Sequence, residues 1–207
     1  MKLLNLKIMN KKRLKDQLYL LVILEKNLIK LELLSFSNLI RRILLKEIYN
    51  FKVSTISIFL FNSNKFCYKI HEFTKVEEVK NNLVSFLILL KEIKFRSYYK
   101  LKTKRTFALL KIKQFTQVFL TDIILPNNFK ILSIDNNLIK LNSLDINLKV
   151  LLELHKSKGY NFNPVKKVNY IEENNVYFEI YTNQTSTPLE VLVKSLKIIK
   201  LETYLAI

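Results

Sequence analysis

Few residues in this chain of 207 are of types that catalyse reactions or bind metal ions. The chain contains one cysteine, Cys67, and two histidines, His71 and His155. A structural zinc site needs four soft ligands at short spacing, which these three residues do not provide. Neither histidine stands in a pattern typical of a nucleophilic triad with Cys67. We therefore predict no metal site and no nucleophilic active site.

A phosphate-binding loop and a general-base pair are also not expected from the residues present. Gly159 is the only glycine, whereas a phosphate-binding loop needs two or three glycines so that backbone amides can approach the phosphate. His71 and Glu72 are adjacent. Adjacent side chains on a strand point to opposite faces, so this pair is not expected to act as a general base. We predict that the chain uses no cofactor and catalyses nothing itself.

Arg41 and Arg42 are the residues best suited to bind a partner. Only five of the 35 basic residues are arginines, so an adjacent pair is hard to explain by composition. Each guanidinium is a planar fork that can bind a carboxylate or a backbone carbonyl of another chain. Two solvated surface arginines are the alternative interpretation.

The formal net charge of +18 suggests contact with an anionic partner, but composition offers a second explanation. The chain is rich in Lys, Asn, Ile, Phe and Tyr, whose codons are rich in A and T. An A/T-rich genome, of the kind found in reduced organelles, would produce such a composition without selection for phosphate contacts. Net charge alone therefore does not predict DNA binding.

The apolar stretches are too short to span a membrane. Leu18–Leu24 and Leu83–Leu90 are followed by Glu25-Lys26 and Lys91-Glu92, and a spanning helix needs about 20 apolar residues. The first residues contain no apolar run of signal-peptide length. A single thiol also favours a reducing compartment. We predict no membrane association.

The first half of the chain predicts strands and two helices. Residues 17–34 are apolar and interrupted by Glu25-Lys26-Asn27, which predicts two strands joined by a tight turn. Ser35 or Ser37 can cap the helix that follows. A hairpin is predicted from 53–61 and 65–70 around the turn residues 62–64, and apolar spacings of three and four predict a helix over 76–90.

The second half is predicted to be mostly strand, with one helix at the end. The expected strands are Ile93–Tyr99, Thr106–Ile112, Lys130–Ile134, Lys149–His155 and Val176–Tyr181. Thr187, Pro188 and Glu190 form an N-cap, a first-turn proline and a capping box, which predict the start of the last helix. The order of elements favours one α+β domain interrupted by a second, mostly β domain.

Several segments resemble, in the same order, the α subunit of bacterial and plastid RNA polymerases. Ser37–Leu45 is similar to the family pattern GNALRRILL, and Ile70–Thr74 to HEFST. Lys156–Tyr160 resembles GRGY, with Gly159 in the place of its glycine. Pro164–Glu172 is similar to SPVKKVNYxVE, and the segment from Phe178 to Pro188 to LEIxTNGSIxP. The resemblance extends over about residues 19–205.

The resemblance implies a subunit that assembles the polymerase without catalysing nucleotide addition. Its fold would be α+β, with a discontinuous dimerisation domain at 1–51 and 160–207 and an inserted β-rich domain at 52–159. A second copy of the chain would be one partner, and the β-type and β′-type large subunits the others. No sequence-specific DNA contact is expected, and an A/T-rich plastid genome is the expected source.

The resemblance also implies roles for individual residues. The expected contacts to the large subunits are Asn38, Arg41, Arg42, His71, Glu72, Phe73, Gly159 and Tyr160. The expected dimer contacts are Leu39, Ile43, Leu192, Leu196 and Ile199, as apolar faces that a monomer would leave exposed. The alternative is a divergent organellar ribosomal protein that uses its positive charge to bind rRNA. Such a protein should gather basic and aromatic residues on one face.

Overall fold

The computed structural model describes residues 6–25, 30–61, 67–74, 83–98, 103–113, 117–132, 137–140, 147–173 and 175–205. The chain divides into two compact units. Residues 1–50 and 157–207 form one, which we call the discontinuous unit, and residues 51–156 form the inserted unit. Both combine helix with mostly antiparallel strands, which confirms the predicted α+β class.

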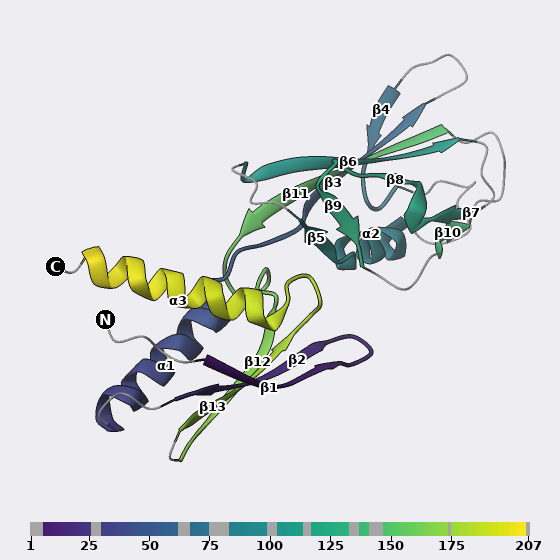
Figure 1. Ribbon diagram of the computed structural model, residues 1–207. Helices are drawn as coiled ribbons and strands as arrows, with labels where there is room; N and C mark the ends of the chain where they lie inside the picture. The colour runs from purple at the N-terminus through teal and green to yellow at the C-terminus, as the bar shows by residue number, and fades with distance from the viewer. Residues whose placement is uncertain are drawn as a thin grey trace. The chain divides into compact units, whose positions relative to one another are not determined.

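A four-stranded antiparallel sheet forms the base of the discontinuous unit (Figure 1). Its strands, in spatial order, are β1 (Leu6–Arg13), β2 (Leu18–Leu24), β13 (Val176–Thr182) and β12 (Val165–Glu172). Side chains alternate between buried and half-buried along β13, as expected for a strand with one face on a core. The sheet therefore pairs the first strands of the chain with the last.

Two helices contact this sheet and each other: α1 (Lys30–Lys46) and α3 (Pro188–Leu205). The predicted capping box begins α3, because Thr187 N–H donates to Glu190 Oε2 (3.0 Å) and Glu190 N–H donates to Thr187 Oγ1 (3.3 Å). Ile40 and Leu44 of α1 and Val191 and Leu192 of α3 are buried in the core of the unit. The helices thus cover one face of the sheet with their most apolar sides.

A five-stranded sheet is the largest element of the inserted unit. Its order is β4 (Cys67–Ile70), β3 (Asn50–Phe61), β11 (Asn147–Ser157), β6 (Arg105–Lys113) and β8 (Ile123–Ile124). The helix α2 (Leu83–Glu92) lies on one side of this sheet (Figure 1) and buries Phe86 and Leu90 in the second core.

Shorter elements complete the inserted unit. β5 (Phe95–Ser97) pairs with β9 (Phe129–Ile131), and β7 (Gln117–Phe119) pairs with β10 (Asn137–Lys140). The 3-10 turn η1, Leu120–Asp122, precedes β8. The turn-forming residues Pro126, Asn127 and Asn128 lie directly before β9.

The start of α1 differs from its prediction. The second strand expected within residues 17–34 is wrong, because the helix already begins at Lys30. Ser35 and Ser37 therefore lie inside the helix and do not cap it, and Ser37 is buried. Residues 26–29, which include part of the predicted turn, lie outside the described residues.

The other predicted elements are found with shifted bounds. The predicted strands over 53–61, 106–112, 149–155 and 176–181 each lie within a longer observed strand. Turn residues 62–64 and the first part of the predicted helix over 76–90 lie outside the described residues. Among the described helices, none is long and apolar enough to cross a membrane.

Candidate functional site

The exposed side of α1 carries three of the predicted contact residues. Asn38, Arg41 and Arg42 are all exposed. Asn38 Oδ1 accepts a hydrogen bond from Tyr170 Oη (2.7 Å), and Arg41 Nε donates to the carbonyl of Val168 (3.2 Å). Both partners lie on the edge strand β12, so this side of α1 is held to the edge of the sheet.

Arg42 differs from Arg41 in its surroundings. Within the part of the chain that the structure describes, its guanidinium makes no hydrogen bond or ion pair. Arg42 lies one turn before Lys46, the last residue of α1, so the two side chains share a face of the helix. The structure therefore presents one arginine tied to its own sheet and one whose charged group is open to a partner.

The segment that contains Gly159 and Tyr160 attaches to the end of α1. Gly159 N–H donates to the carbonyl of Lys46 (3.1 Å), an acceptor that the last helical turn leaves unpaired. Lys158 Nζ forms an ion pair with Glu47 Oε2. Gly159 has a φ of +102°, and the Tyr160 side chain is 94% exposed. The chain thus turns sharply at its only glycine and projects a tyrosine into solvent.

Asn163 fixes the same segment from inside and was not among the predicted residues. It is buried; its Nδ2 donates to the carbonyl of Leu44 (2.7 Å), and its Oδ1 accepts from Val165 N–H (2.8 Å). The side chain therefore joins the end of α1 to the start of β12. Its position directly before Pro164 is a turn signal that sequence analysis could have used.

His71, Glu72 and Phe73 lie in the inserted unit, in a turn after β4. His71 N–H donates to Thr74 Oγ1 (3.1 Å), Thr74 N–H donates back to the carbonyl of His71 (3.0 Å), and the rings of His71 and Phe73 have centroids 5.4 Å apart. Phe73 is 72% exposed. The turn therefore presents an aromatic side chain to solvent.

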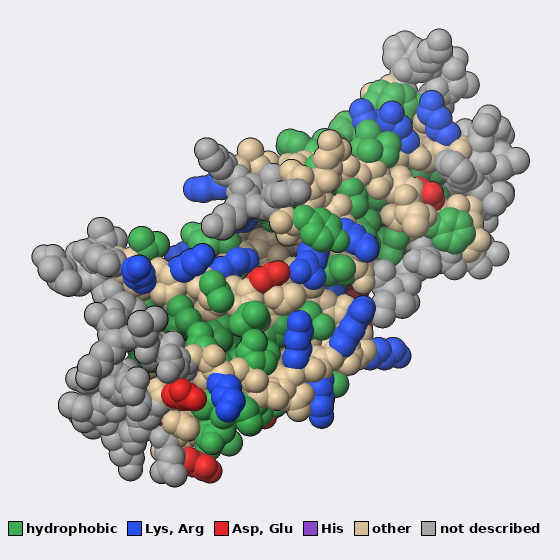
Figure 2. Space-filling model, viewed as in Figure 1, with side chains coloured by type: hydrophobic (Ala, Val, Ile, Leu, Met, Phe, Trp, Pro, Cys, Tyr) green, Lys and Arg blue, Asp and Glu red, His purple; other side chains and the backbone are tan. Residues whose placement is uncertain are grey.

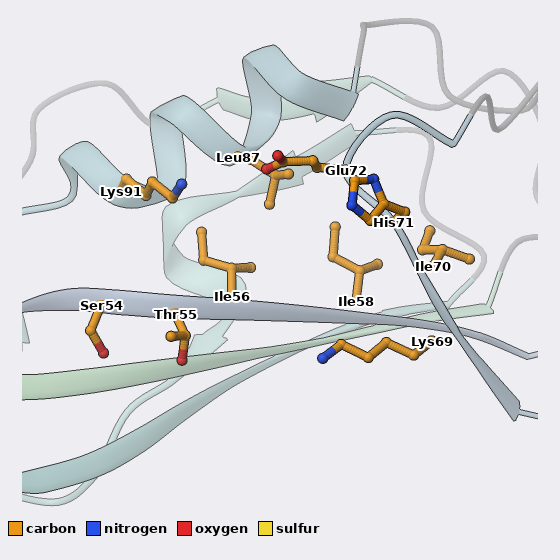
Figure 3. Close-up of a pocket in the computed structure, with 10 residues that line it drawn as sticks. All are labelled: Ser54, Thr55, Ile56, Ile58, Lys69, Ile70, His71, Glu72, Leu87 and Lys91. Atoms are coloured by element: carbon orange, nitrogen blue, oxygen red, sulfur yellow. The ribbon is translucent and has the colours of Figure 1, made fainter.

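His71 and Glu72 also line an open pocket of about 300 Å³ beside α2. In Figure 3, Ile56 and Ile58 rise from β3 toward Leu87 of α2, with His71 and Glu72 at one end of the opening. The expectation that these two side chains point to opposite faces was wrong, because β4 ends at Ile70 and both residues belong to the turn. The pocket has an apolar floor and a charged rim, which suits an apolar side chain of a partner.

The predicted dimer residues divide into two groups. Leu39 is 38% exposed and Leu196 is half-buried. The expectation that Ile43, Leu192 and Ile199 would be exposed in a monomer was wrong, because all three are buried in the core of the discontinuous unit. The most regular apolar stripe of a helix packs on the sheet of its own domain. Contacts to another chain then use a neighbouring side of the helix.

Other apolar side chains of these helices are exposed instead. They are Leu34 on α1 and Leu189, Val193 and Leu201 on α3. Leu189, Val193 and Leu196 follow one another at spacings of four and three, so they share one side of α3. Figure 2 shows hydrophobic side chains gathered on the visible face of the discontinuous unit, bordered by lysines or arginines. Exposed apolar patches of this kind are typical of surfaces that bind another protein.

The described residues show little of what a catalytic site requires. No group of three or more His, Cys, Asp or Glu residues that could hold a metal ion is found among them. Partial burial, followed by the charge of Glu179, raises the pKa of the Tyr19 hydroxyl. Tyr19 Oη donates to Glu179 Oε1 (3.2 Å), and this pair lies on the sheet of the discontinuous unit.

Comparison with known proteins decides the family. Residues 28–202 match the family model of the RNA polymerase Rpb3/Rpb11 dimerisation domain. The chain belongs to the α-subunit family of DNA-directed RNA polymerases. It is 31% identical to the DNA-directed RNA polymerase subunit alpha of Euglena longa over 80% of this chain and 83% of that protein. It is 37% identical to the same subunit of Euglena viridis over 70% of each, and 28% identical to that of Euglena stellata over 80% and 81%.

Membership of this α-subunit family confirms the resemblance and the assembly role. The chain is a non-catalytic subunit of a multisubunit RNA polymerase, and the active site belongs to other subunits. The family also favours transcription over the ribosomal alternative. It does not assign the individual contacts of Asn38, Arg41, Arg42, His71, Glu72, Phe73, Gly159 and Tyr160, which stay predictions.

Proposed function

We propose that two copies of this chain associate through α1 and α3, and that each copy then binds one large subunit of a plastid RNA polymerase. The exposed apolar residues on both helices of the discontinuous unit carry this proposal. In a two-fold dimer both copies use the same patch, so the exposed apolar residues of each copy would be buried against those of the other. The second copy is the one partner that the family model's name, a dimerisation domain, also supports.

A charge placed within this patch should separate the copies. Val193→Glu and Leu39→Glu each put a carboxylate where the partner helix would pack, and the cost of burying an unpaired charge should favour the monomer. Ile171→Glu is the matched control, because Ile171 is an exposed apolar residue on the edge strand β12. Sedimentation at about micromolar concentration should show a dimer for the wild type and the control. A wild-type monomer at that concentration would overturn the dimer.

For the large subunits, we infer that the contact surface consists of the open side of α1 with Tyr160, and of the turn with Phe73. Arg42 supports this most directly, because its guanidinium is exposed and has no partner within the described chain. Arg41 is already bonded to Val168, so it both positions β12 and presents its remaining donors. The pocket beside Phe73 provides a place for an apolar anchor.

The test separates binding from folding. Arg42→Ala should change the stability of the isolated chain by only about 0.5 kcal/mol, as surface substitutions usually do. Truncating a charge buried at an interface commonly costs about 2–5 kcal/mol of binding, so recovery of the large subunits with the tagged chain should fall sharply. Arg13→Ala, at the end of the edge strand β1, is the control. Undiminished recovery with Arg42→Ala would remove this residue from the interface.

A plastid location is supported by two facts. The relatives above come from species of Euglena, and the residue usage is that of an A/T-rich genome. We further expect no sequence-specific DNA contact by this chain, and any attraction to DNA should disappear with salt as expected for counterion release. Sequence-selective binding that persists at physiological salt would contradict this expectation.

A further inference from the structure

The five-stranded sheet of the inserted unit has a second face, which does not contribute to the core. On β6, Ala108, Leu110 and Ile112 are buried, and the residues between them point to the other side. Residues directly opposite in antiparallel strands share a face. Phe107 opposite Glu153, Leu109 opposite Leu151, and Lys111 opposite Lys149 therefore lie together on what we call the outer face.

Apolar side chains form a stripe across this outer face. Leu109 pairs with Leu151 on β11 and with Ile124 on β8, so the three residues lie side by side on adjacent strands. Ile124 is 55% exposed, and Phe107, two residues from Leu109, is 56% exposed. Two neighbouring large side chains with more than half of their surface in water are unusual for a sheet face that has no partner.

Lysines lie directly beside the stripe in an unfavourable arrangement. Lys111 and Lys149 are exposed and face each other across adjacent strands, where like charges destabilise a sheet. Lys113 follows on the same face of β6. Within the described residues neither Lys111 nor Lys149 forms an ion pair. An anionic partner would relieve this repulsion.

Glu153 is the carboxylate that the described residues place on this part of the outer face, and it is already engaged. Glu153 Oε1 forms an ion pair with Arg105 Nη1 (3.5 Å), and Glu153 Oε2 accepts a hydrogen bond from Thr55 Oγ1 (2.6 Å). Ser54 Oγ also donates to the carbonyl of Glu153 (3.1 Å). Glu153 therefore ties β3, β11 and β6 together, and the described residues provide no other carboxylate bonded to the lysine pair.

We propose that the outer face binds an acidic protein segment that carries aliphatic side chains next to its carboxylates. Residues two apart on a strand are separated by about 6.6–7 Å, so the partner must place a carboxylate at that distance from an apolar side chain. Single-stranded nucleic acid fits less well, because successive bases stack on successive aromatic side chains, whereas Phe107 is followed in the stripe by the aliphatic residues Leu109, Leu151 and Ile124. This docking surface goes beyond the proposed function and does not depend on it.

The experiment measures binding of defined probes to the purified full chain by fluorescence anisotropy. The probes are a labelled peptide in which leucine and aspartate occupy every second position in turn, with serine between them so that both lie on one face, the same peptide with serine in place of leucine, and a single-stranded oligouridine. The double variant K111E/K149E tests the lysine pair. The double variant K104E/K130E is the matched control, because it changes the net charge equally at exposed lysines of the same unit outside the stripe.

We expect the leucine–aspartate peptide to bind best, and K111E/K149E to weaken it about tenfold or more relative to K104E/K130E. The serine peptide should bind about tenfold more weakly than the leucine peptide, because the stripe then gains no apolar contact. Circular dichroism checks that both variants are folded. Equal weakening by the two double variants, or no peptide binding, would overturn the proposal. Tighter, stripe-dependent binding of oligouridine would overturn it in favour of nucleic acid.

Discussion

Arg41 and Arg42 are neighbours in the sequence but have different surroundings in the structure. The pair could be selected from the sequence as a binding feature, because arginine is rare in this lysine-rich chain. The bond from Arg41 Nε to the carbonyl of Val168 could not be predicted, because the two residues are far apart along the chain and meet only when β12 lies beside α1. The sequence therefore identified the two arginines, but it did not show that Arg41 is hydrogen-bonded to the sheet while Arg42 is not.

Gly159 should be sensitive to substitution for a conformational reason. Nothing lies within 4 Å of the position that a Cβ would occupy, but the φ of +102° disfavours any L side chain. We expect Gly159→Ala to lower the free energy of unfolding by about 1–3 kcal/mol, measured by urea denaturation at fixed protein concentration. Lys158→Ala, which removes the exposed ion pair with Glu47, is the control and should change the free energy of unfolding by less than about 1 kcal/mol. Equal effects would show that the backbone conformation is not the cause.

Asn163 is the second residue where a single change should be costly. Replacing it with alanine leaves the Leu44 carbonyl and the Val165 N–H without this partner, and a buried polar group that loses its hydrogen bond costs about 1–3 kcal/mol. We expect a loss of about 2–4 kcal/mol in the free energy of unfolding. Asn161→Ala, at an exposed position two residues earlier, should be nearly neutral. A neutral Asn163→Ala would mean that water replaces both bonds.

Among the secondary-structure elements, helix-start signals were reliable where nearby residues form the capping hydrogen bonds themselves. The capping box of Thr187 and Glu190 involves residues three apart, and both of its hydrogen bonds are present. Ser37 is also a residue type that caps helices, yet it is buried within α1, where tertiary packing decides the environment. A serine before an apolar run is therefore a weaker signal than a reciprocal pair.

Strands without an apolar alternation were not predicted. Every residue of β1 is exposed, so no buried face leaves a period of two in its sequence. β12 carries the exposed Lys166 and Lys167 near its start and forms the edge that α1 contacts. Both strands lie at the edges of the sheet, where lysine blunts unwanted pairing. The sequence signal of an edge strand therefore resembles that of a loop.

The sheet of the discontinuous unit should show its own pH dependence through Tyr19. The pKa of Tyr19 is raised from 10.0, first by burial and then by Glu179, so the folded state keeps a proton that the unfolded state releases. Stability from this source is complete below about pH 10 and is lost as pH rises through the higher pKa of the folded state. The melting temperature of Tyr19→Phe should therefore fall less steeply with rising pH above pH 10 than the melting temperature of the wild type. Parallel curves would exclude this contribution.

At the scale of the whole molecule, the order of elements predicted one domain inserted into another. The sequence did not show which apolar side of each helix faces its own unit. Ile43, Leu192 and Ile199 have the period of a buried side, and periodicity does not say which chain buries them. The structure places them in the core of their own unit and leaves Leu189 and Val193 exposed. We therefore expect the dimer contacts of these helices to lie beside the strongest apolar stripe and not on it.

The inserted unit should fold without the rest of the chain. All buried residues of its core, from Phe51 to Leu154, lie within residues 51–156. We expect the fragment 51–156 to unfold in urea in one cooperative transition, with strand and helix signals in circular dichroism. The fragment 1–50 should show no such transition, because β2 lacks its partner β13. A fragment 51–156 without a cooperative transition would show that this core depends on contacts outside the unit.

The pairing of β2 with β13 has a consequence for the time course of synthesis. Leu24 and Val176 are partners in one sheet, but the whole inserted unit is translated between them. At about 5–20 residues per second, β2 and α1 wait on the order of 10 s for their partner strands. The inserted unit begins and ends on the neighbouring strands β3 and β11, so its early folding brings the two flanking segments to one place. During synthesis, folding of the inserted unit thus reduces the distance over which β13 must find β2, before β13 has left the ribosome.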